Sequence, residues 1–316
     1  MDYRINTTHR YHTEKLRTLG WELTVCNSLY PENTVLRSIL VDNKPFGRLL
    51  YSYLSKYIPM DKINKIIEIG GGYGCLMKDF LDINSALRPT MIDISPFLLE
   101  KQRETLKDYK VTFIERNFFD VDEVFLKNYD LVIMNENLGD FPAVVGLKKD
   151  MLKLFNPDTT EPFIEKIRAL FEKYSLPLPA EDTFNLNIGA IEAIEKLCIS
   201  GIPYIYAGEH SCEASPPEHL KSLIKFVPKG NPERIPLMGH DEYTIKFSYL
   251  KKVGESFGYR VIRGVFADFI HFIFDKRIGH ILATQGRHSD EAEIICQFIE
   301  DLYRYEYLIF IKADSV

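Results

Sequence analysis

The stretch K-I-I-E-I-G-G-G-Y-G-C-L, residues 65–76, decides the fold of this chain. Isoleucines on both sides of Glu68 predict a buried β-strand over residues 65–69, and a helical pattern begins at Cys75. The loop between strand and helix contains four glycines, which let a ligand approach the backbone closely: Gly70, Gly71, Gly72 and Gly74. A loop of this kind is typical of a nucleotide-binding site.

The spacing of these glycines distinguishes between cofactors. The dinucleotide fingerprint G-x-G-x-x-G needs a third small residue, and that position holds Cys75, so the fit is imperfect. The G-x-G-x-G spacing after the acidic Glu68 suits the amino-acid end of S-adenosylmethionine, which carries charges of both signs. We therefore predict S-adenosylmethionine as the cofactor, with S-adenosylhomocysteine as its product. A nicotinamide or flavin cofactor and a purely structural turn are the alternatives.

Two later segments are expected to complete the cofactor site. Asp93 ends the apolar run 90–94, 23 residues beyond the first glycine of the loop, where an acid can accept hydrogen bonds from both ribose hydroxyl groups. The next expected strand, 111–115, leads to Asn117 and Phe118. These two residues are candidates for contacts with the adenine amine and the adenine ring. A loop amide and a core aromatic residue would fit the same pattern.

Composition predicts a cytoplasmic enzyme. The chain has 316 residues and a net charge of −6, without the dense Lys/Arg runs of a nucleic-acid-binding surface, so nucleic acid is not an expected partner. Its five cysteines are scattered without a C-x-x-C pair, so we expect reduced thiols and no metal site. No apolar run reaches the roughly 20 residues of a membrane span, and the first residues lack a signal pattern.

Strand and helix patterns alternate along most of the chain, which predicts an α/β fold with helices on both faces of a parallel sheet. The expected strands are 65–69, 90–94, 111–115, 131–135, 202–206, 259–265 and 306–311, and the expected helices include 75–83, 96–106 and 247–257.

The chain is expected to have four parts. Residues 1–60 predict a helical lead-in, with a helix near 46–57 that covers either the cofactor or the edge of the sheet. Residues 61–142 and 199–316 are the two halves of the α/β domain. Residues 143–198 show only helical patterns, so we predict a helical insertion after the fourth strand. It would lie above the carboxyl ends of the strands and select the substrate.

Polar residues at the ends of the fourth and fifth strands are candidates for acceptor chemistry. The fourth strand leads into Asn135, Glu136 and Asp140, and carboxylates there could hold a guanidinium through paired hydrogen bonds. The fifth strand is followed by Glu209 and His210, and the histidine could accept a proton. Capped or hydrogen-bonded turns would explain the same residues. We select Glu136 to orient the acceptor, because it directly follows a rigid strand.

Several of these segments together resemble the MidA-type methyltransferases, the relatives of the mitochondrial complex I assembly methyltransferase. The resemblance spans roughly residues 46–265 and rests on 68–79, on Asp93-Ile94-Ser95-Pro96 with Leu99 and Gln102, on Asn135-Glu136 with Pro142, and on H-D-E-Y-T-I-K-F-S-Y-L at 240–250. It implies a Rossmann-like class I fold with a mostly parallel seven-stranded sheet, an insertion after the fourth strand, and a protein arginine as acceptor. The expected cofactor-binding residues are Glu68, Gly70, Gly71, Gly72, Gly74, Asp93, Ile94, Asn117, Phe118 and Asn135.

The chain departs from that family at two positions near the site. The family's acid three places after the glutamate falls on Gly139, with Asp140 next to it, and Gly71 replaces the usual proline of the loop. Another acceptor therefore stays open, as in a small-molecule O- or N-methyltransferase. A non-catalytic binding or assembly protein on the same fold is a further alternative, and the sequence leaves the oligomeric state open.

Overall fold

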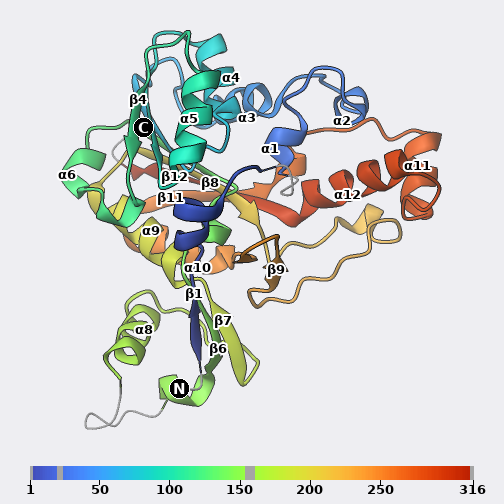
Figure 1. The fold of residues 1–316 in the computed structure, drawn as a ribbon. Helices are drawn as coiled ribbons and strands as arrows, with labels where there is room; N and C mark the ends of the chain where they lie inside the picture. Colours follow the sequence, from blue (N-terminus) through green and yellow to red (C-terminus); the bar gives the residue numbers. More distant parts are fainter. Residues whose placement is uncertain (1–2, 20–23, 154–160, 314–316) are drawn as a thin grey trace.

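A seven-stranded sheet forms the centre of the computed structural model, which describes residues 3–19, 24–153 and 161–313 (Figure 1). Its strands are β2 (Lys65–Ile69), β3 (Arg88–Asp93), β4 (Thr112–Glu115), β5 (Leu131–Asn135), β8 (Tyr204–His210), β11 (Tyr259–Val265) and β12 (Tyr305–Lys312). Their order is β11-β12-β8-β5-β2-β3-β4. Only β12 runs antiparallel to its neighbours within this sheet, so the sheet is mostly parallel, as predicted.

Helices cover both faces of this sheet and bury two apolar cores. Successive side chains of a strand point to opposite faces, so in β5 Leu131 and Ile133 join one core while Val132 and Met134 join the other. The first core also takes residues from α3 (Phe46–Leu54), α4 (Cys75–Ile83), α11 (Lys276–Ala283) and α12 (Asp290–Arg304). The second takes residues from α6 (Glu123–Leu126), α9 (Ile188–Ser200) and α10 (Phe247–Ser256).

Local sequence signals set several helix starts. Helix α5 (Pro96–Thr105) begins after Ser95, whose side chain accepts a hydrogen bond from the Leu98 backbone, with Pro96 in the first turn. The short helices α1 (Val25–Ser28) and α2 (Val35–Ser38) begin in the same way after Thr24 and Thr34. Among the described residues, none of the helices combines the length and apolar character that a membrane span requires.

The insertion after β5 is not purely helical, which corrects the prediction. It contains β6 (Ala143–Lys148) and β7 (Thr183–Leu186), which form a small antiparallel sheet with β1 (Arg4–Asn6), besides α7 (Lys149–Lys153) and α8 (Pro162–Lys173). Two valines at 144 and 145 favour a strand, and the partner strand β1 lies far away in sequence, so a local helical pattern was misleading. Figure 1 shows β1, β6, β7 and α8 projecting together from the central sheet.

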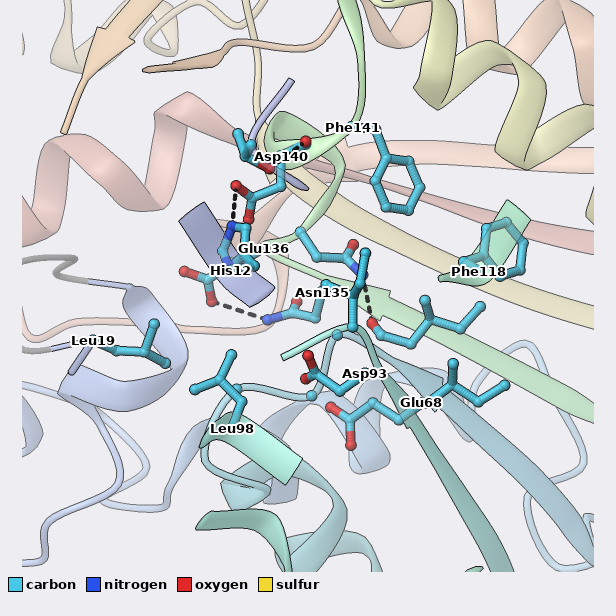
Figure 2. A pocket seen from close by; sticks show the side chains of 18 of the residues that line it. His12, Leu19, Glu68, Asp93, Leu98, Phe118, Asn135, Glu136, Asp140 and Phe141 are labelled. Carbon is cyan, nitrogen blue, oxygen red and sulfur yellow. Dashed lines mark hydrogen bonds and ion pairs between the residues drawn. The ribbon is translucent and has the colours of Figure 1, made fainter. Parts of the chain in front are cut away.

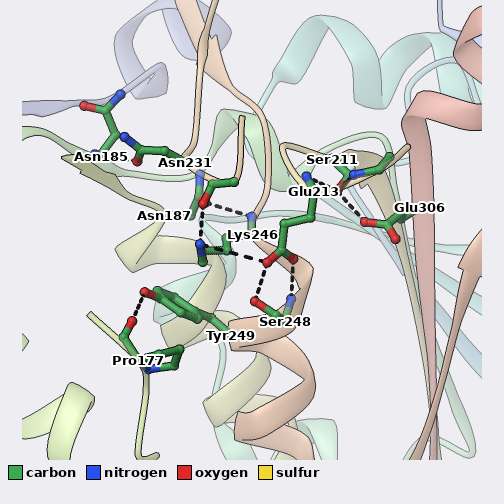
Figure 3. A network of polar contacts seen from close by, with 12 residues as sticks. Pro177, Asn185, Asn187, Ser211, Glu213, Asn231, Lys246, Ser248, Tyr249 and Glu306 are labelled. Atoms are coloured by element: carbon green, nitrogen blue, oxygen red, sulfur yellow. Dashed lines mark hydrogen bonds and ion pairs between the residues drawn. The ribbon is translucent and has the colours of Figure 1, made fainter. Parts of the chain in front are cut away.

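A network of hydrogen bonds fixes the long segment between β8 and α10 (Figure 3). Both carboxylate oxygens of Glu213 accept bonds at the start of α10, from the Ser248 backbone at 2.8 Å and the Ser248 hydroxyl at 2.5 Å. Asn187 bonds to the backbone of Thr244 and Lys246 at 3.1 and 3.2 Å. A carboxylate at a helix N-terminus is electrostatically favourable. The network thereby anchors the hairpin of β9 (Arg234–Pro236) and β10 (Asp241–Tyr243).

Candidate active site

The Gly-rich loop and the carboxyl ends of β2, β3 and β5 border a cavity of about 200 Å³ (Figure 2). Strands β3 and β5 lie on opposite sides of β2, and such a switch point is where open α/β sheets bind ligands. Most of the residues predicted for the site line this cavity: Glu68, Gly70, Gly71, Gly72, Asp93, Ile94, Asn117, Phe118, Asn135, Glu136 and Asp140.

Three predicted residues are not among those that line the cavity. Gly74 is the residue before α4, with φ of 81°. Glu209 accepts backbone bonds from His210 and Gly139 at 2.8 and 3.2 Å. The His210 ring stacks on Tyr305 with centroids 3.9 Å apart. The fifth strand was expected to end at residue 206, but β8 continues to His210, so Glu209 and His210 belong to the sheet rather than to a loop above it.

The conformation of the loop explains two of its glycines. Gly70 and Gly72 have φ of 65° and 52°, in the left-handed region that favours glycine. A Cβ atom on Gly70 would lie 2.8 Å from Nδ2 of Asn137. Asn137 itself donates a hydrogen bond to the carbonyl of Ile69 and lines the cavity, a role that the sequence analysis did not assign to it. Its position just beyond β5 was the only signal available.

Two buried carboxyl groups face the cavity from β2 and β3. Burial, reinforced by repulsion from Asp93, raises the pKa of Glu68 to about 8. Burial also raises the pKa of Asp93 to about 6, although Asp93 accepts bonds from the Ser95 backbone at 2.9 Å and the Gln102 amide at 2.8 Å. Glu68 Oε2 and Asn137 Oδ1 are buried and have no hydrogen-bond partner among the described residues. These two oxygens fit a ligand that brings N–H or O–H donors, as S-adenosylmethionine does.

Glu136 lies at the end of β5 in a backbone conformation that non-glycine residues rarely adopt, with φ of 53°. Its carboxylate accepts bonds from the backbone of Val25 at 2.8 Å and Cys26 at 3.0 Å, and from the Asn135 side chain at 2.9 Å. Burial raises the pKa of Glu136 to about 8 in spite of these donors. Strained residues of this kind are concentrated at functional sites, where the strain costs roughly 1–3 kcal/mol.

Residues near the N-terminus form the remaining wall of the cavity, and the sequence analysis missed their individual roles. The lining residues from this segment are Thr7, Thr8, His9, His12, Leu19, Thr24, Cys26 and Asn27. The helix expected near 46–57 is α3, which packs against α4 instead. The lead-in does cover the cofactor cavity, but through residues within 7–19 and 24–27 rather than through that helix.

One histidine of this segment bonds to a predicted acid. His12 lies in the short π-helix η1 (Tyr11–Lys15), and Asp140 lies in the 3-10 helix η3 (Leu138–Asp140). His12 Nε2 is 2.8 Å from Asp140 Oδ1. His240, before β10, has its Nε2 3.6 Å from the same oxygen. Burial lowers the pKa of His240.

Comparison with known proteins agrees with this site. Residues 67–160 match a family model described as a methyltransferase domain. No curated protein matches the chain. A crystal structure of an uncharacterised COG1565 superfamily protein from Burkholderia thailandensis superposes with a TM-score of 0.56 at 14% identity, covering 98% of this chain and 87% of that one.

A second structure from the same organism has a TM-score of 0.50 at 14% identity. It is a COG1565 superfamily member described as a likely methyl transferase bound to S-adenosyl-homocysteine. The match covers 84% of this chain and 76% of that one. At this identity the two structures establish the fold alone, which is the Rossmann-like class I methyltransferase fold. Together with the domain match, the Gly-rich loop and Asp93, the fold defines the chain as an S-adenosylmethionine-dependent methyltransferase.

Proposed function

We propose that this methyltransferase transfers the methyl group to a nitrogen atom of a cationic acceptor, and that the acceptor is an arginine side chain of a protein. The observation that carries the proposal is the position of Glu136 and Asp140, whose carboxylates line the same cavity as the cofactor residues. Asp140 already contacts His12 at 2.8 Å and His240 at 3.6 Å, whereas Glu136 forms no ion pair with a Lys, Arg or His among the described residues. The resemblance to the MidA-type family supports the choice of arginine.

The chemistry needs an acceptor held in line with the departing sulfur, and a site for the proton that the methylated nitrogen loses. A carboxylate has about four lone-pair sites, and the Val25, Cys26 and Asn135 donors occupy three of those of Glu136. The remaining site can accept an N–H of the acceptor. Burial raises the pKa of Glu136 to about 8, so most Glu136 side chains are protonated at neutral pH in the free protein. A bound cationic acceptor favours the ionised carboxylate, which can then take up the proton that the methylated nitrogen loses.

Methyl transfer with wild-type protein and Glu136→Gln tests this role. Labelled S-adenosylmethionine is supplied with arginine-containing peptides, a protein extract or a metabolite extract. We expect labelled protein arginine with the wild type, turnover reduced by roughly 10²-fold in Glu136→Gln, and donor affinity within a few-fold, the pattern of a lost transition-state interaction. Glu100→Gln, at an exposed position on α5, is the matched control. Equal turnover in wild type and Glu136→Gln would rule out this role for Glu136.

A small-molecule O- or N-methyltransferase is the second candidate function. It is favoured by the N-terminal segment, which supplies one wall of the cavity and so leaves less room for a protein chain beside the cofactor. The same assay separates the two candidates, because label that enters only the metabolite extract would support the small-molecule function.

A further inference from the structure

Three potential metal ligands from distant parts of the chain meet at the cavity wall. They are His12 in η1, Asp140 in η3 and His240 in the turn before β10, and their ligand atoms all lie within 4.8 Å of one another. Figure 2 shows His12 and Asp140 side by side, joined by the 2.8 Å contact between Nε2 and Oδ1. His240 Nε2 lies 3.6 Å from the same Asp140 oxygen.

These separations suit ligands around one ion. Bonds of about 2.0–2.2 Å in a tetrahedral arrangement place neighbouring donor atoms about 3.3–3.6 Å apart. The two distances to Asp140, 2.8 and 3.6 Å, are close to that spacing, and the two histidine ligand atoms lie within 4.8 Å of each other. Glu242 lies beside the site, with Oε1 3.3 Å from His240 Nε2, but it is not one of the three residues whose ligand atoms gather there. Imidazole and carboxylate together favour divalent first-row metals such as Zn²⁺, Co²⁺ and Fe²⁺.

The position of His240 is fixed by its surroundings. Its side chain is only 3% exposed, and its Nδ1 has no hydrogen-bond partner among the described residues. The ring stacks on Tyr11, with centroids 4.1 Å apart and planes at 22°. Gly239 makes this approach possible, because its φ is 104° and a Cβ there would lie 2.8 Å from Tyr11 Cε2. Burial and stacking therefore hold the ring with its Nε2 toward Asp140, which is the nitrogen that would bind an ion.

We propose that His12, Asp140 and His240 bind a divalent transition-metal ion, which fastens the N-terminal segment over the cofactor cavity. His12 comes from the segment that covers the cavity, whereas Asp140 and His240 come from the body of the domain, so a single ion would link the two. The ion would replace the direct contact between His12 and Asp140. The ion would take an oxygen of Asp140, so Glu136 alone would hold the acceptor, and the metal site does not depend on which acceptor is methylated. It also replaces the expectation of no metal, which rested on the cysteine pattern and could not detect ligands of this type.

Titration of the metal-free full-length protein tests the site. After treatment with a chelator, Zn²⁺ binding is measured by calorimetry and Co²⁺ binding by visible absorption. We expect one ion per chain in the wild type and binding at least about 100-fold weaker in His12→Gln and His240→Ala, since each variant removes one of three protein ligands. His219→Ala, an exposed histidine elsewhere, is the matched control and should bind like the wild type.

A second measurement reports the fastening itself. Zn²⁺ should slow hydrogen exchange of backbone amides in residues 8–16 of the wild type and leave that of His240→Ala unchanged. Circular dichroism and a cooperative thermal melt show that each variant is folded. The proposal is overturned by absent stoichiometric binding in the wild type, by undiminished binding in the folded variants, or by exchange in residues 8–16 that does not respond to the ion.

Discussion

Glu68 should lose a proton when the cofactor binds. In the free protein its carboxyl group is buried, one oxygen has no partner among the described residues, and the pKa is raised to about 8 by burial and by Asp93. Most Glu68 side chains are therefore protonated at neutral pH. The cofactor brings an ammonium group, which favours the ionised carboxylate. Binding and loss of the proton are consequently coupled.

The size of the effect follows from the pKa. Below that value, each pH unit changes the ionised fraction of Glu68 about tenfold. Affinity for S-adenosylhomocysteine should therefore rise about tenfold between pH 6 and 7 and level off near pH 8. Asp93, with a pKa of about 6, titrates only at the lower end of this range. Calorimetry in two buffers of different ionisation enthalpy gives both the affinity and the number of protons released, which should be about one.

Two variants assign the proton to its source. Glu68→Gln should bind with an affinity that hardly changes with pH and should release almost no proton. Glu136→Gln removes the other cavity carboxyl whose pKa is about 8, and it should release the proton as the wild type does. The reasoning would be refuted if the affinity of the wild type for S-adenosylhomocysteine stayed constant between about pH 6 and 8. It would also be refuted if proton release disappeared in Glu136→Gln but persisted in Glu68→Gln.

Three further outcomes are expected. Asp93→Ala removes the hydrogen bonds that the ribose would donate to the charged Asp93 carboxylate, and each such bond contributes about 1.5–3 kcal/mol. Calorimetry should therefore show affinity for S-adenosylhomocysteine reduced at least tenfold. Undiminished affinity would exclude the ribose contact. The pKa of Glu136 is raised to about 8 in the folded state and is about 4.3 in the unfolded state, so the folded state binds the proton more tightly. The free energy of unfolding should therefore fall as pH rises between these values. Thermal melts of Glu136→Gln should show a melting temperature that depends less on pH than that of the wild type. Lys148 and Thr183 are paired in the small sheet, so an Asn-Gly turn can join them in a variant that lacks α7 and α8. This variant should have no methyl transfer activity, while calorimetry should show cofactor affinity within a few-fold of the wild type. Lost cofactor binding in a folded variant would place the insertion in the donor site.

Local patterns predicted the central sheet because each signal lies within one short segment. The apolar run before the Gly-rich loop became β2 with the expected bounds, and the helical periodicity after it became α4 over residues 75–83. Ends set by long-range pairing were less accurate. Strand β8 runs to His210 because β12 pairs with it along its whole length, and nothing near Tyr206 in the sequence reports that partner.

The cavity was predictable on the side formed by strand ends, because parallel strands bring their carboxyl ends to one edge of a sheet. Its other wall was not. Thr24 and Cys26 line the cavity beside Glu136, which accepts hydrogen bonds from the backbone N–H groups of Val25 and Cys26. Every residue except proline has a backbone N–H group, so these contacts could not be predicted from the residue types. His12 and His240 were missed for a related reason, since their meeting depends on the folded paths of two separate turns.

The N-terminal segment connects the insertion to the cofactor cavity, and this link gives the insertion a way to influence the acceptor. At its start, β1 pairs with β6, with Arg4 opposite Val145. The Thr8 hydroxyl then donates to the Asp140 carbonyl at 2.8 Å, and further along the Cys26 backbone bonds to Glu136. Residues 143–198 themselves line no part of the cavity in the described chain. A displacement of β6 would therefore act on the acceptor through β1 and the segment that covers the cavity, rather than through direct contact.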